Sequence, residues 1–478
     1  MARALPPFPG FCGPSYQSQS LIASVERSMN WYVERIEVPY GKARQVLYPT
    51  PGLLRLSTAA QSPTKALFAQ NSRCFLAAGR KYYQVAAGTY ALTELGTIAA
   101  DQYPVTINTS GDAGSENFVT AGGTGYLHDL GTGTFTSVVS GATMGGLLDG
   151  YFLRFDIATS TLAISDLLDG TTWDPLQFVQ RSSASDPWKA MLVRQPGIWL
   201  LGEETGDIYY NANAFPFPFR QIANVRIAEG IAAPFSLKDF STGPIWLTYS
   251  SKGGGRVVQA QGYRPTRISN HAVEWAISQY RKNSRIDDAV AFVYEDLGHE
   301  FYELNFPTAG ATWVYDGTTQ QWHERGHWNV GQMRYEAWGP QYHTTFDGKH
   351  IVGDHRSGAI YEMSATQYAD TDGDVLRRER ITPALMDGMR LVRYPRFELL
   401  LEAGIGTADV TNPQIALSIS RDGGRTFGPE RLCSAGASGE FARRLIWTKN
   451  GAARQLALKV VATDKVPWRL INMFFQAA

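Results

Sequence analysis

The chain has 478 residues, and its 44 basic and 44 acidic side chains give a formal net charge of zero. Dedicated nucleic-acid-binding proteins are normally basic, so this balance argues against one, although not against a protein that DNA merely passes through. The length exceeds one ordinary hydrophobic core unless the core is modular. The three cysteines lie far apart, which argues against a disulfide framework. The sequence has no apolar run typical of a signal peptide or a membrane helix, so we expect a protein made in the cytoplasm.

Residues 1–55 are predicted to form an extended N-terminal arm, because four prolines within the first 14 residues disfavour a helix. The arm also carries more apolar surface than is stable in water. A segment that is both apolar and extended suits a contact across a neighbouring molecule. We therefore expect contacts between subunits, or with an adaptor protein, at five aromatic residues: Phe8, Phe11, Tyr16, Trp31 and Tyr32. The alternative is that the arm packs against the body of its own chain.

Residues 56–395 alternate short apolar runs with glycine-rich turns, which indicates a β domain. In Gly298–Gly326, aromatic runs flank Asp316-Gly317, a dipeptide typical of hairpin turns. A weak internal repeat relates Leu200–Tyr209 to Ile351–Tyr361 and, more loosely, to Phe118–Leu127. Such repeats predict a β-propeller, with roughly six or seven blades over this length.

One helix is predicted over Asn270–Lys282, because Val273, Ile277 and Tyr280 recur on a single helical face. Residues 396–478 show a cleaner alternation of apolar and polar positions, which predicts a C-terminal β-sandwich or an added sheet. The predicted fold class is therefore all-β: a β-propeller body with an extended N-terminal arm and a C-terminal β-sandwich-like region.

The segment 420–427 fits the Asp-box pattern S-x-D-x-G-x-T-aromatic. In such a turn the Ser and Asp side chains bond backbone N–H groups, glycine permits the tight conformation, and the aromatic ring lies under the turn. We predict a structural role for its five defining residues: Ser420, Asp422, Gly424, Thr426 and Phe427.

Other clusters match catalytic or metal sites only in part. His323 and His327 are four residues apart, but in a strand this spacing separates the rings too far for one metal ion. Asp370–Asp374 resembles the start of a calcium loop, yet Val375 and Ile381 stand where that loop needs Gly and Glu. We therefore predict no catalytic residue, no cofactor and no metal, and expect the protein not to be an enzyme.

Two arginine-rich stretches are candidates for contact with DNA phosphates. One is RRER at 377–380, and the other comprises Arg425 with Arg443 and Arg444. Arginines of this kind are more often solvated, or form salt bridges between subunits. Both interpretations remain open from the sequence.

Three sets of motifs, in the same order along the chain, resemble one family of phage proteins. The N-terminal set is GPSYQSQS, ERSMNWY and LYPTPGL, between Gly13 and Leu53. The central set is GHEFYELNFP, TWVYD, WHERG and VGDHRSGAIY, between Gly298 and Tyr361. The C-terminal set is the Asp-box segment and LIWTKNG (Leu445–Gly451). Together they resemble the packaged-DNA stabilisation proteins, or tail hub (nozzle) proteins, of short-tailed bacteriophages.

The resemblance implies a structural virion protein that assembles as a homohexamer below the head–tail adaptor protein. Such a ring completes the head, retains the packaged DNA and continues the channel through which double-stranded DNA is ejected. It also implies partners among tail fibre or needle proteins, a place in the phage tail after synthesis in the host cytoplasm, and no membrane insertion by this chain.

Two other classes of function remain open: a tail-associated propeller enzyme that acts on glycans, and a carbohydrate-binding receptor module. The enzyme needs two carboxylates about 5–10 Å apart in one cleft. The receptor module favours a distinct tip domain, whereas the family-like motifs continue almost to the C-terminus.

Overall fold

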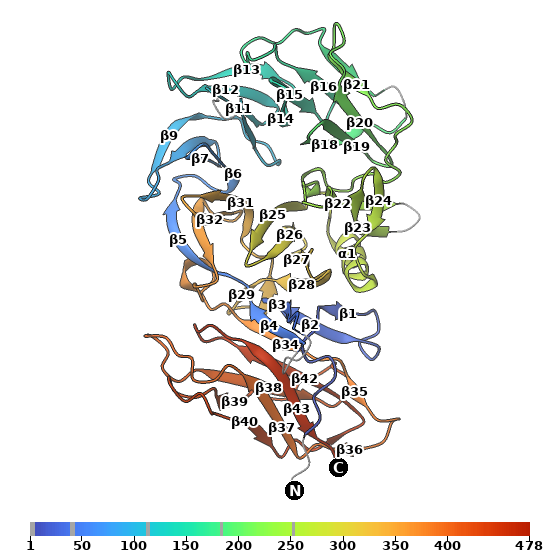
Figure 1. Ribbon diagram of the computed structural model, residues 1–478, viewed down its shortest axis with the longest axis vertical. Coiled ribbons are helices and arrows are strands. Elements are labelled where there is room, and N and C mark those ends of the chain that lie inside the picture. The colour runs from blue at the N-terminus through green and yellow to red at the C-terminus, as the bar shows by residue number, and fades with distance from the viewer. Residues whose placement is uncertain (1–4, 39–43, 111–114, 182–184, 251–253) are drawn as a thin grey trace.

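The structure is a computed structural model that describes residues 5–38, 44–110, 115–181, 185–250 and 254–478. A β-propeller occupies one end of the long axis and a β-sandwich the other (Figure 1). Within those ranges the helical elements are α1 (His271–Asn283) and two 3₁₀ turns, η1 (Pro234–Ser236) and η2 (Thr371–Gly373). The predicted fold class is confirmed. No helix in the same ranges has the length and apolar character needed to cross a membrane.

The first four blades are consecutive four-stranded antiparallel sheets. Blade 1 is β6 (Thr64–Gln70), β7 (Arg73–Ala78), β8 (Lys81–Val85) and β9 (Leu92–Thr97). Blade 2 is β10 (Thr106–Thr109), β11 (Glu116–Ala121), β12 (Thr124–Asp129) and β13 (Phe135–Ser140). Blade 3 is β14 (Met144–Leu148), β15 (Tyr151–Asp156), β16 (Thr161–Ile164) and β17 (Phe178–Gln180). Blade 4 is β18 (Trp188–Arg194), β19 (Gly197–Gly202), β20 (Gly206–Asn211) and β21 (Phe219–Gln221).

Three further sheets complete the ring. Blade 5 is β22 (Ile245–Ser250), β23 (Gly254–Gln261) and β24 (Arg264–Arg267), with α1 packed on β23. Blade 6 is β25 (Val290–Asp296), β26 (His299–Phe306), β27 (Ala311–Asp316) and β28 (Gln321–Arg325). Blade 7 is β31 (Pro340–Phe346), β32 (Lys349–Asp354), β33 (Ala359–Ser364) and β5 (Gly52–Thr58). The short hairpin β29 (His327–Asn329) and β30 (Arg334–Glu336) joins the last two blades.

Blade 7 closes the ring with strands from both ends of the propeller sequence. Its outer strand, β5, comes from the N-terminal part of the chain and pairs with β33, while its inner strand, β31, lies against β6 of blade 1. The repeated segments Phe118–Leu127, Leu200–Tyr209 and Ile351–Tyr361 each cover the second and third strands of a blade. The internal repeat is therefore the blade itself, and the described residues form seven blades, within the predicted range.

The turn after β27 differs in detail from the predicted hairpin. Its residue in the left-handed region is Gln320, with φ of 56°, rather than Asp316 or Gly317. The Asp316 carboxylate instead accepts a hydrogen bond from the Thr318 amide at 2.9 Å. Gly317 is needed for space, since a Cβ there would lie 2.5 Å from the Phe240 ring.

The predicted helix is present as α1, one residue further along the chain than expected. Asn270 is its N-cap, and the Asn270 side chain accepts a hydrogen bond from the Val273 amide at 3.0 Å. Val273 and Ile277 are buried, as their spacing predicts.

The C-terminal sandwich has two main sheets, whose apolar faces form one core. One sheet has the order β3-β4-β43-β37-β40, and the other continues through β34-β42-β38-β39. The N-terminal strands are β1 (Tyr16–Gln17), β2 (Val25–Met29), β3 (Trp31–Arg35) and β4 (Gln45–Pro49). The C-terminal strands are β34 (Arg378–Ile381), β35 (Leu385–Met386), β36 (Val392–Arg393), β37 (Arg396–Leu401), β38 (Gln414–Ser420), β39 (Arg431–Ser434), β40 (Leu445–Thr448), β41 (Ala452–Ala453), β42 (Gln455–Ala462) and β43 (Leu470–Gln476).

The N-terminal segment is extended, but its strands pair with strands of the propeller and the sandwich of the same chain. Strand β2 lies between β28 of blade 6 and β34 of the sandwich, so one sheet runs from the propeller into the sandwich. Strands β3 and β4 join the other sandwich sheet, and β5 completes blade 7. The predicted division into 1–55, 56–395 and 396–478 therefore needs correction: β5 crosses the first boundary, and the sandwich strands begin at β34, before the second.

Candidate functional site

The WHERG motif (Trp322–Gly326) lies at the junction of propeller, sandwich and N-terminal segment. Glu324, at the end of blade 6, accepts two hydrogen bonds from Arg27 on β2, with Nε–Oε1 and Nη2–Oε2 distances of 3.1 and 2.8 Å. Burial alone would lower the pKa of Arg27, but the Glu324 carboxylate outweighs this effect, and the net pKa lies above its usual range. A bidentate pair of this kind fixes orientation as well as distance. It holds β2 against the edge of the propeller.

The next residue of the motif, Arg325, belongs to a fully buried ion pair. Its Nη1 lies 3.1 Å from Glu303 Oε2, and both side chains are buried in blade 6. The guanidinium also lies 3.4 Å from the centre of the Trp338 ring and donates to the Pro51 carbonyl at 2.9 Å. Burial raises the pKa of Glu303, and the charge of Arg325 opposes this shift. The pair therefore connects blade 6 to the entry of β5.

Asn30 joins the three parts through its amide. It has φ of 58°, a left-handed conformation that Asn tolerates better than most residues. Its Oδ1 accepts from the Gly326 amide at 3.0 Å, and its Nδ2 donates to the carbonyls of Gly326 and Arg377 at 2.9 and 2.8 Å. One buried side chain thus bonds to the propeller and to the start of the sandwich.

Arg380 on β34 is the second fastening point, and it is fully buried. Its guanidinium donates to the carbonyls of Phe11 at 2.7 Å, Gly10 at 2.6 Å and Pro14 at 2.9 Å. It also bonds Ser28 Oγ at 3.0 Å and lies 3.3 Å from a Glu26 carboxylate oxygen. The backbone of residues 10–14 therefore curves around one arginine of the sandwich.

These contacts correct the expectation that the RRER stretch meets DNA phosphates or another subunit. Arg378 and Arg380 are fully buried, so neither can meet DNA phosphates or an opposite charge on another subunit. Arg377 is partly buried, 2.6 Å from Glu430 and 4.6 Å from the centre of the Trp328 ring. Glu379 lies 4.0 Å from Arg27. The residues of this stretch therefore make contacts within their own chain.

Histidines next to the junction occupy opposite electrostatic environments. His299 lies between two carboxylates, 2.8 Å from Asp316 Oδ2 and 2.8 Å from Glu34 Oε2. Burial lowers the pKa of His299, but the bonds to Asp316 and Glu34 outweigh it and raise the pKa to about 9. His323 is buried among aromatic rings, and burial lowers its pKa to about 3.

The two histidines of the HERGH spacing do not converge. His323 lies in blade 6, whereas His327 Nδ1 bonds Asp370 Oδ2 at 3.1 Å. Asp370 also caps η2 by accepting from the Thr371 amide, and Asp372 accepts from the Tyr361 hydroxyl at 2.6 Å. Within the described ranges, no three His, Cys, Asp or Glu side chains are grouped so that they could hold a metal ion.

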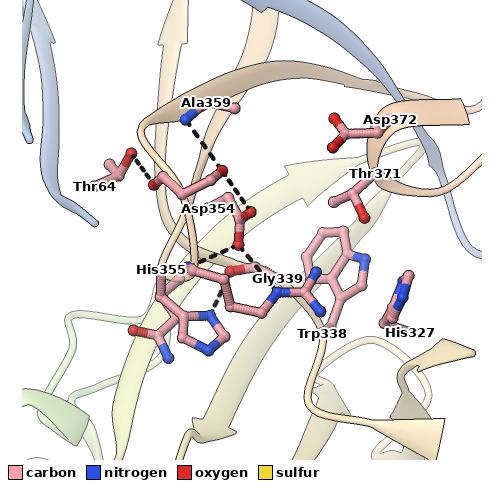
Figure 2. A network of polar contacts seen from close by, with 12 residues as sticks. Thr64, His327, Trp338, Gly339, Asp354, His355, Ala359, Thr371 and Asp372 are labelled. Atoms are coloured by element: carbon pink, nitrogen blue, oxygen red, sulfur yellow. Dashed lines mark hydrogen bonds and ion pairs between the residues drawn. The ribbon is translucent and has the colours of Figure 1, made fainter. Parts of the chain in front are cut away.

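The VGDHRSGAIY motif seals the closed ring. Figure 2 shows Asp354 at the end of β32, where it accepts from Arg356 N at 3.0 Å and Ser357 Oγ at 2.7 Å in the turn that leads to β33. Across the blade boundary, the Thr64 amide of blade 1 donates to the Ser357 carbonyl at 2.8 Å. Gly358 permits this approach, because a Cβ there would lie 2.3 Å from the Gln61 carbonyl oxygen.

The Asp-box turn has the hydrogen bonds that its sequence predicts. Asp422 accepts from the Arg425 and Thr426 amides, each at 3.0 Å, and from Thr426 Oγ1 at 2.6 Å. Ser420 Oγ accepts from the Gly424 amide at 2.8 Å. Burial would raise the pKa of Asp422, but these hydrogen bonds hold it well below its usual range.

The other parts of the Asp box pack on the N-terminal segment. Gly424 has φ of 93°, and a Cβ there would lie 2.5 Å from Val25 of β2. Phe427 is partly buried against the small cluster that contains Val25. The turn therefore contacts the strand that links sandwich and propeller.

Four of the five aromatic residues expected at a subunit contact are buried within their own chain. The exposed fractions are 2% for Phe8 and Phe11, 0% for Trp31 and 5% for Tyr32. Phe8, Phe11 and Trp31 belong to the sandwich core, and Tyr32 packs beside blade 6. The expectation for these four is therefore wrong, because they have no surface left for a partner. Tyr16 is half-buried on β1.

Sequence reasoning missed the charged contacts of the junction. Glu303 stands between Tyr302 and Leu304, and Arg27 alternates with Val25 and Met29 along β2, which are the signals that could have marked these two as inward-facing. Their charges are neutralised by protein groups. The junction is thus arranged to hold three segments together, rather than to expose a nucleophile or a base.

Two family models cover almost the whole chain. Residues 30–368 match the model described as bacteriophage P22 Gp10, beta-propeller, and residues 377–477 match the model described as bacteriophage P22 Gp10, beta-sandwich. No curated protein sequence matches the chain.

Among solved structures, the N-terminal domain of Nup159 aligns with 10% identity over 71% of this chain and 99% of its own, at a TM-score of 0.41. A chain of the mitotic checkpoint complex aligns with 11% identity over 69% of this chain and 95% of its own, at a TM-score of 0.42. Likeness at this level carries no conclusion about function. The two family matches do carry one: the chain belongs to the bacteriophage P22 Gp10 family and is a structural protein of the phage tail.

Proposed function

We propose that the chain is the nozzle, or hub, of a short phage tail. Six copies form a ring below the head–tail adaptor, continue the DNA channel and complete the head by retaining the packaged genome. The ring also anchors tail fibres or a tail needle. Membership of the P22 Gp10 family supports this assignment most directly.

The junction supports the assignment, because it would let each subunit withstand a mechanical force. Three segments are joined there by the Arg27–Glu324 pair, by Asn30 and by Arg380. A largely buried network in which each of these charges has a partner resists separation, because removal of one partner leaves an uncompensated charge. A tail ring under the pressure of packaged DNA needs subunits whose two domains do not move apart.

The proposal is tested by imaging the purified protein, alone and with the adaptor-bearing head. We expect closed rings with sixfold symmetry that attach to the adaptor, and heads that lose DNA when the protein is omitted. A protein that stays monomeric in both conditions contradicts the proposal. Turnover of a capsular polysaccharide by the intact protein would instead support the glycan-acting alternative.

A further inference from the structure

The zero net charge conceals two oppositely charged ends. Residues 377–478 hold 16 basic and 9 acidic side chains, whereas residues 1–376 hold 28 basic and 35 acidic ones. The C-terminal part of the sandwich is therefore formally +7 and the rest of the chain, which includes the N-terminal sandwich strands, −7. Figure 1 places the sandwich at one end of the long axis and blades 2 and 3 at the other.

The acidic charge is concentrated at the far end of the propeller. Residues 106–180, which span blades 2 and 3, hold eight acidic side chains and one basic one. Several of these carboxylates accept hydrogen bonds from backbone amides in the turns to which they belong. Asp129 accepts from the Gly131 amide at 2.7 Å, and Asp169 accepts from the Thr171 amide at 2.8 Å.

The positive charge gathers around the loop that follows β40. Arg421 donates to the Asn450 carbonyl at 2.9 Å, and Arg431 donates to the Thr448 carbonyl at 3.0 Å, so both guanidinium groups converge on one loop. Lys449 is part of that loop and is exposed. On the adjoining strands, Arg393 pairs in register with Ala452, two residues before Arg454. With Arg425 of the Asp-box turn, these residues form what we call the basic cluster: Arg393, Arg421, Arg425, Arg431, Lys449 and Arg454.

The cluster lacks compensating acidic groups. None of its six side chains forms an ion pair with any residue that the structure describes, and all except Arg431 are exposed. Nearby carboxylates are otherwise engaged: Asp422 bonds within its own turn, and Glu430 pairs with Arg377. Burial and the charge of Arg421 lower the pKa of Arg431, as expected where like charges are held close together.

We propose that the basic cluster binds the phosphate backbone of double-stranded DNA, and that each chain in the ring turns its sandwich end toward the DNA channel. This inference rests on the proposed function. Guanidinium groups suit phosphate because they present several donors in a fixed plane. The acidic far end repels the same polyanion, so the charge distribution favours one orientation of the chain relative to DNA.

The competing occupant is a protein, either the acidic end of a second copy or the adaptor. Three apolar side chains in the neighbouring segment 385–393, which contains β35 and β36, are exposed and favour a protein contact there: Met386, Met389 and Leu391. The DNA assignment is favoured for the cluster itself. Five of its six side chains are exposed and none forms an ion pair with a described residue, so the cluster offers a concentrated positive charge to a polyanion.

The test measures binding of a fluorescein-labelled DNA duplex by anisotropy over a series of salt concentrations. The variant is Arg393→Glu with Lys449→Glu and Arg454→Glu. The control makes the same change of net charge at three exposed arginines of the propeller: Arg73→Glu, Arg220→Glu and Arg264→Glu. We expect the cluster variant to bind at least about tenfold more weakly, with the slope of log K against log salt reduced by about 2–3, and the control to change little.

Ring formation, imaged for every protein, separates the inference from the function on which it rests. Equal DNA binding by the cluster variant and the control overturns the inference, while intact rings leave the proposed function standing. Loss of rings in the cluster variant alone also overturns it, because the cluster is then a protein contact. If that variant does not fold, Lys449→Gln with Arg454→Gln replaces it, with an expected smaller loss of the same sign.

Discussion

Two arginine-rich regions of the sandwich, the junction and the basic cluster, differ in the burial and in the bonding partners of their arginines. In the junction, Arg380 is fully buried and satisfied by backbone carbonyls, a hydroxyl and Glu26. In the basic cluster, Arg393 and Arg454 are exposed and have no acidic partner among the described residues. The first arrangement neutralises charge to hold segments together, whereas the second leaves charge available for a partner. Burial and partners, not composition, decide what an arginine does here.

The largest expected effect comes from removing the N-terminal half of the junction. Deletion of residues 1–30 takes away Phe8 and Phe11 from the core and β2 from the middle of a sheet. Loss of two buried aromatic side chains alone costs about 6–10 kcal/mol, comparable to the whole stability of a domain. We expect an insoluble or unfolded product, measured by soluble yield and circular dichroism. A folded, soluble monomer would show that the segment is dispensable for folding.

Substitution of single arginines tests the comparison directly. Arg380→Ala leaves Glu26 and several buried carbonyls without a donor, so we expect a loss of about 3–5 kcal/mol in the free energy of unfolding. Arg393→Ala removes an exposed charge and should change it by less than about 0.5 kcal/mol. Both are measured by denaturant titration of the full chain. Similar losses for the two variants would contradict the distinction between the regions.

Much of the fold was predictable because its signals are local. The internal repeat predicted blades, and the positions of Val273 and Ile277 predicted the buried face of α1. The path of the N-terminal segment was not predictable in this way. Prolines disfavour a central strand, and here Pro7 forms only an isolated bridge with Phe474 and the Pro14 carbonyl bonds Arg380, while β2 pairs within a sheet. The prolines and the strand serve different functions only a few residues apart.

The candidate site was less predictable, since its contacts join residues far apart in sequence. Arg27 and Glu324 are 297 positions apart, and no local sequence pattern at either residue predicts its contact with the other. The Asp-box contacts were predictable because Ser420, Asp422 and Thr426 lie within one turn. Local motifs therefore predicted local geometry, and the junction required the fold.

The pH dependence of stability tests whether buried charge holds the junction. The folded pKa of His299, about 9, lies above its ordinary value of 6.5. Its contribution is therefore complete below pH 6.5 and lost as the pH rises through 9, a change of up to about 3 kcal/mol. His299→Gln should remove this pH dependence and leave the protein less stable at pH 6 than the natural chain. Parallel stability curves for the two proteins would show that the carboxylates do not hold the imidazolium.

A smaller effect is expected at the Asp-box turn, whose position lies between the two regions. Asp422→Ala removes hydrogen bonds to the amides of Arg425 and Thr426, worth about 1 kcal/mol each in net stability. We expect a loss of about 1–2 kcal/mol in thermal or denaturant unfolding, with ring formation retained. Asp409→Ala, at an exposed position, is the control. Unchanged stability together with lost assembly would contradict a structural role.

The smallest effect on stability is expected at Tyr16, a half-buried residue at the exposed edge of the junction. Tyr16 lies on β1, a two-residue strand that pairs with β2 and has no second partner strand among the described residues. Because the side chain is only half-buried, Tyr16→Ser should change the free energy of unfolding by about 0.5 kcal/mol or less. Of the five aromatic residues first expected at a subunit contact, it is the one that retains surface for a partner. We therefore expect the variant to fold normally but to attach more weakly to its neighbours or to the adaptor, measured by sedimentation of assembled rings. Normal assembly at every protein concentration would remove the last of these aromatic residues from the interface, and would leave the N-terminal segment with a role inside its own chain alone.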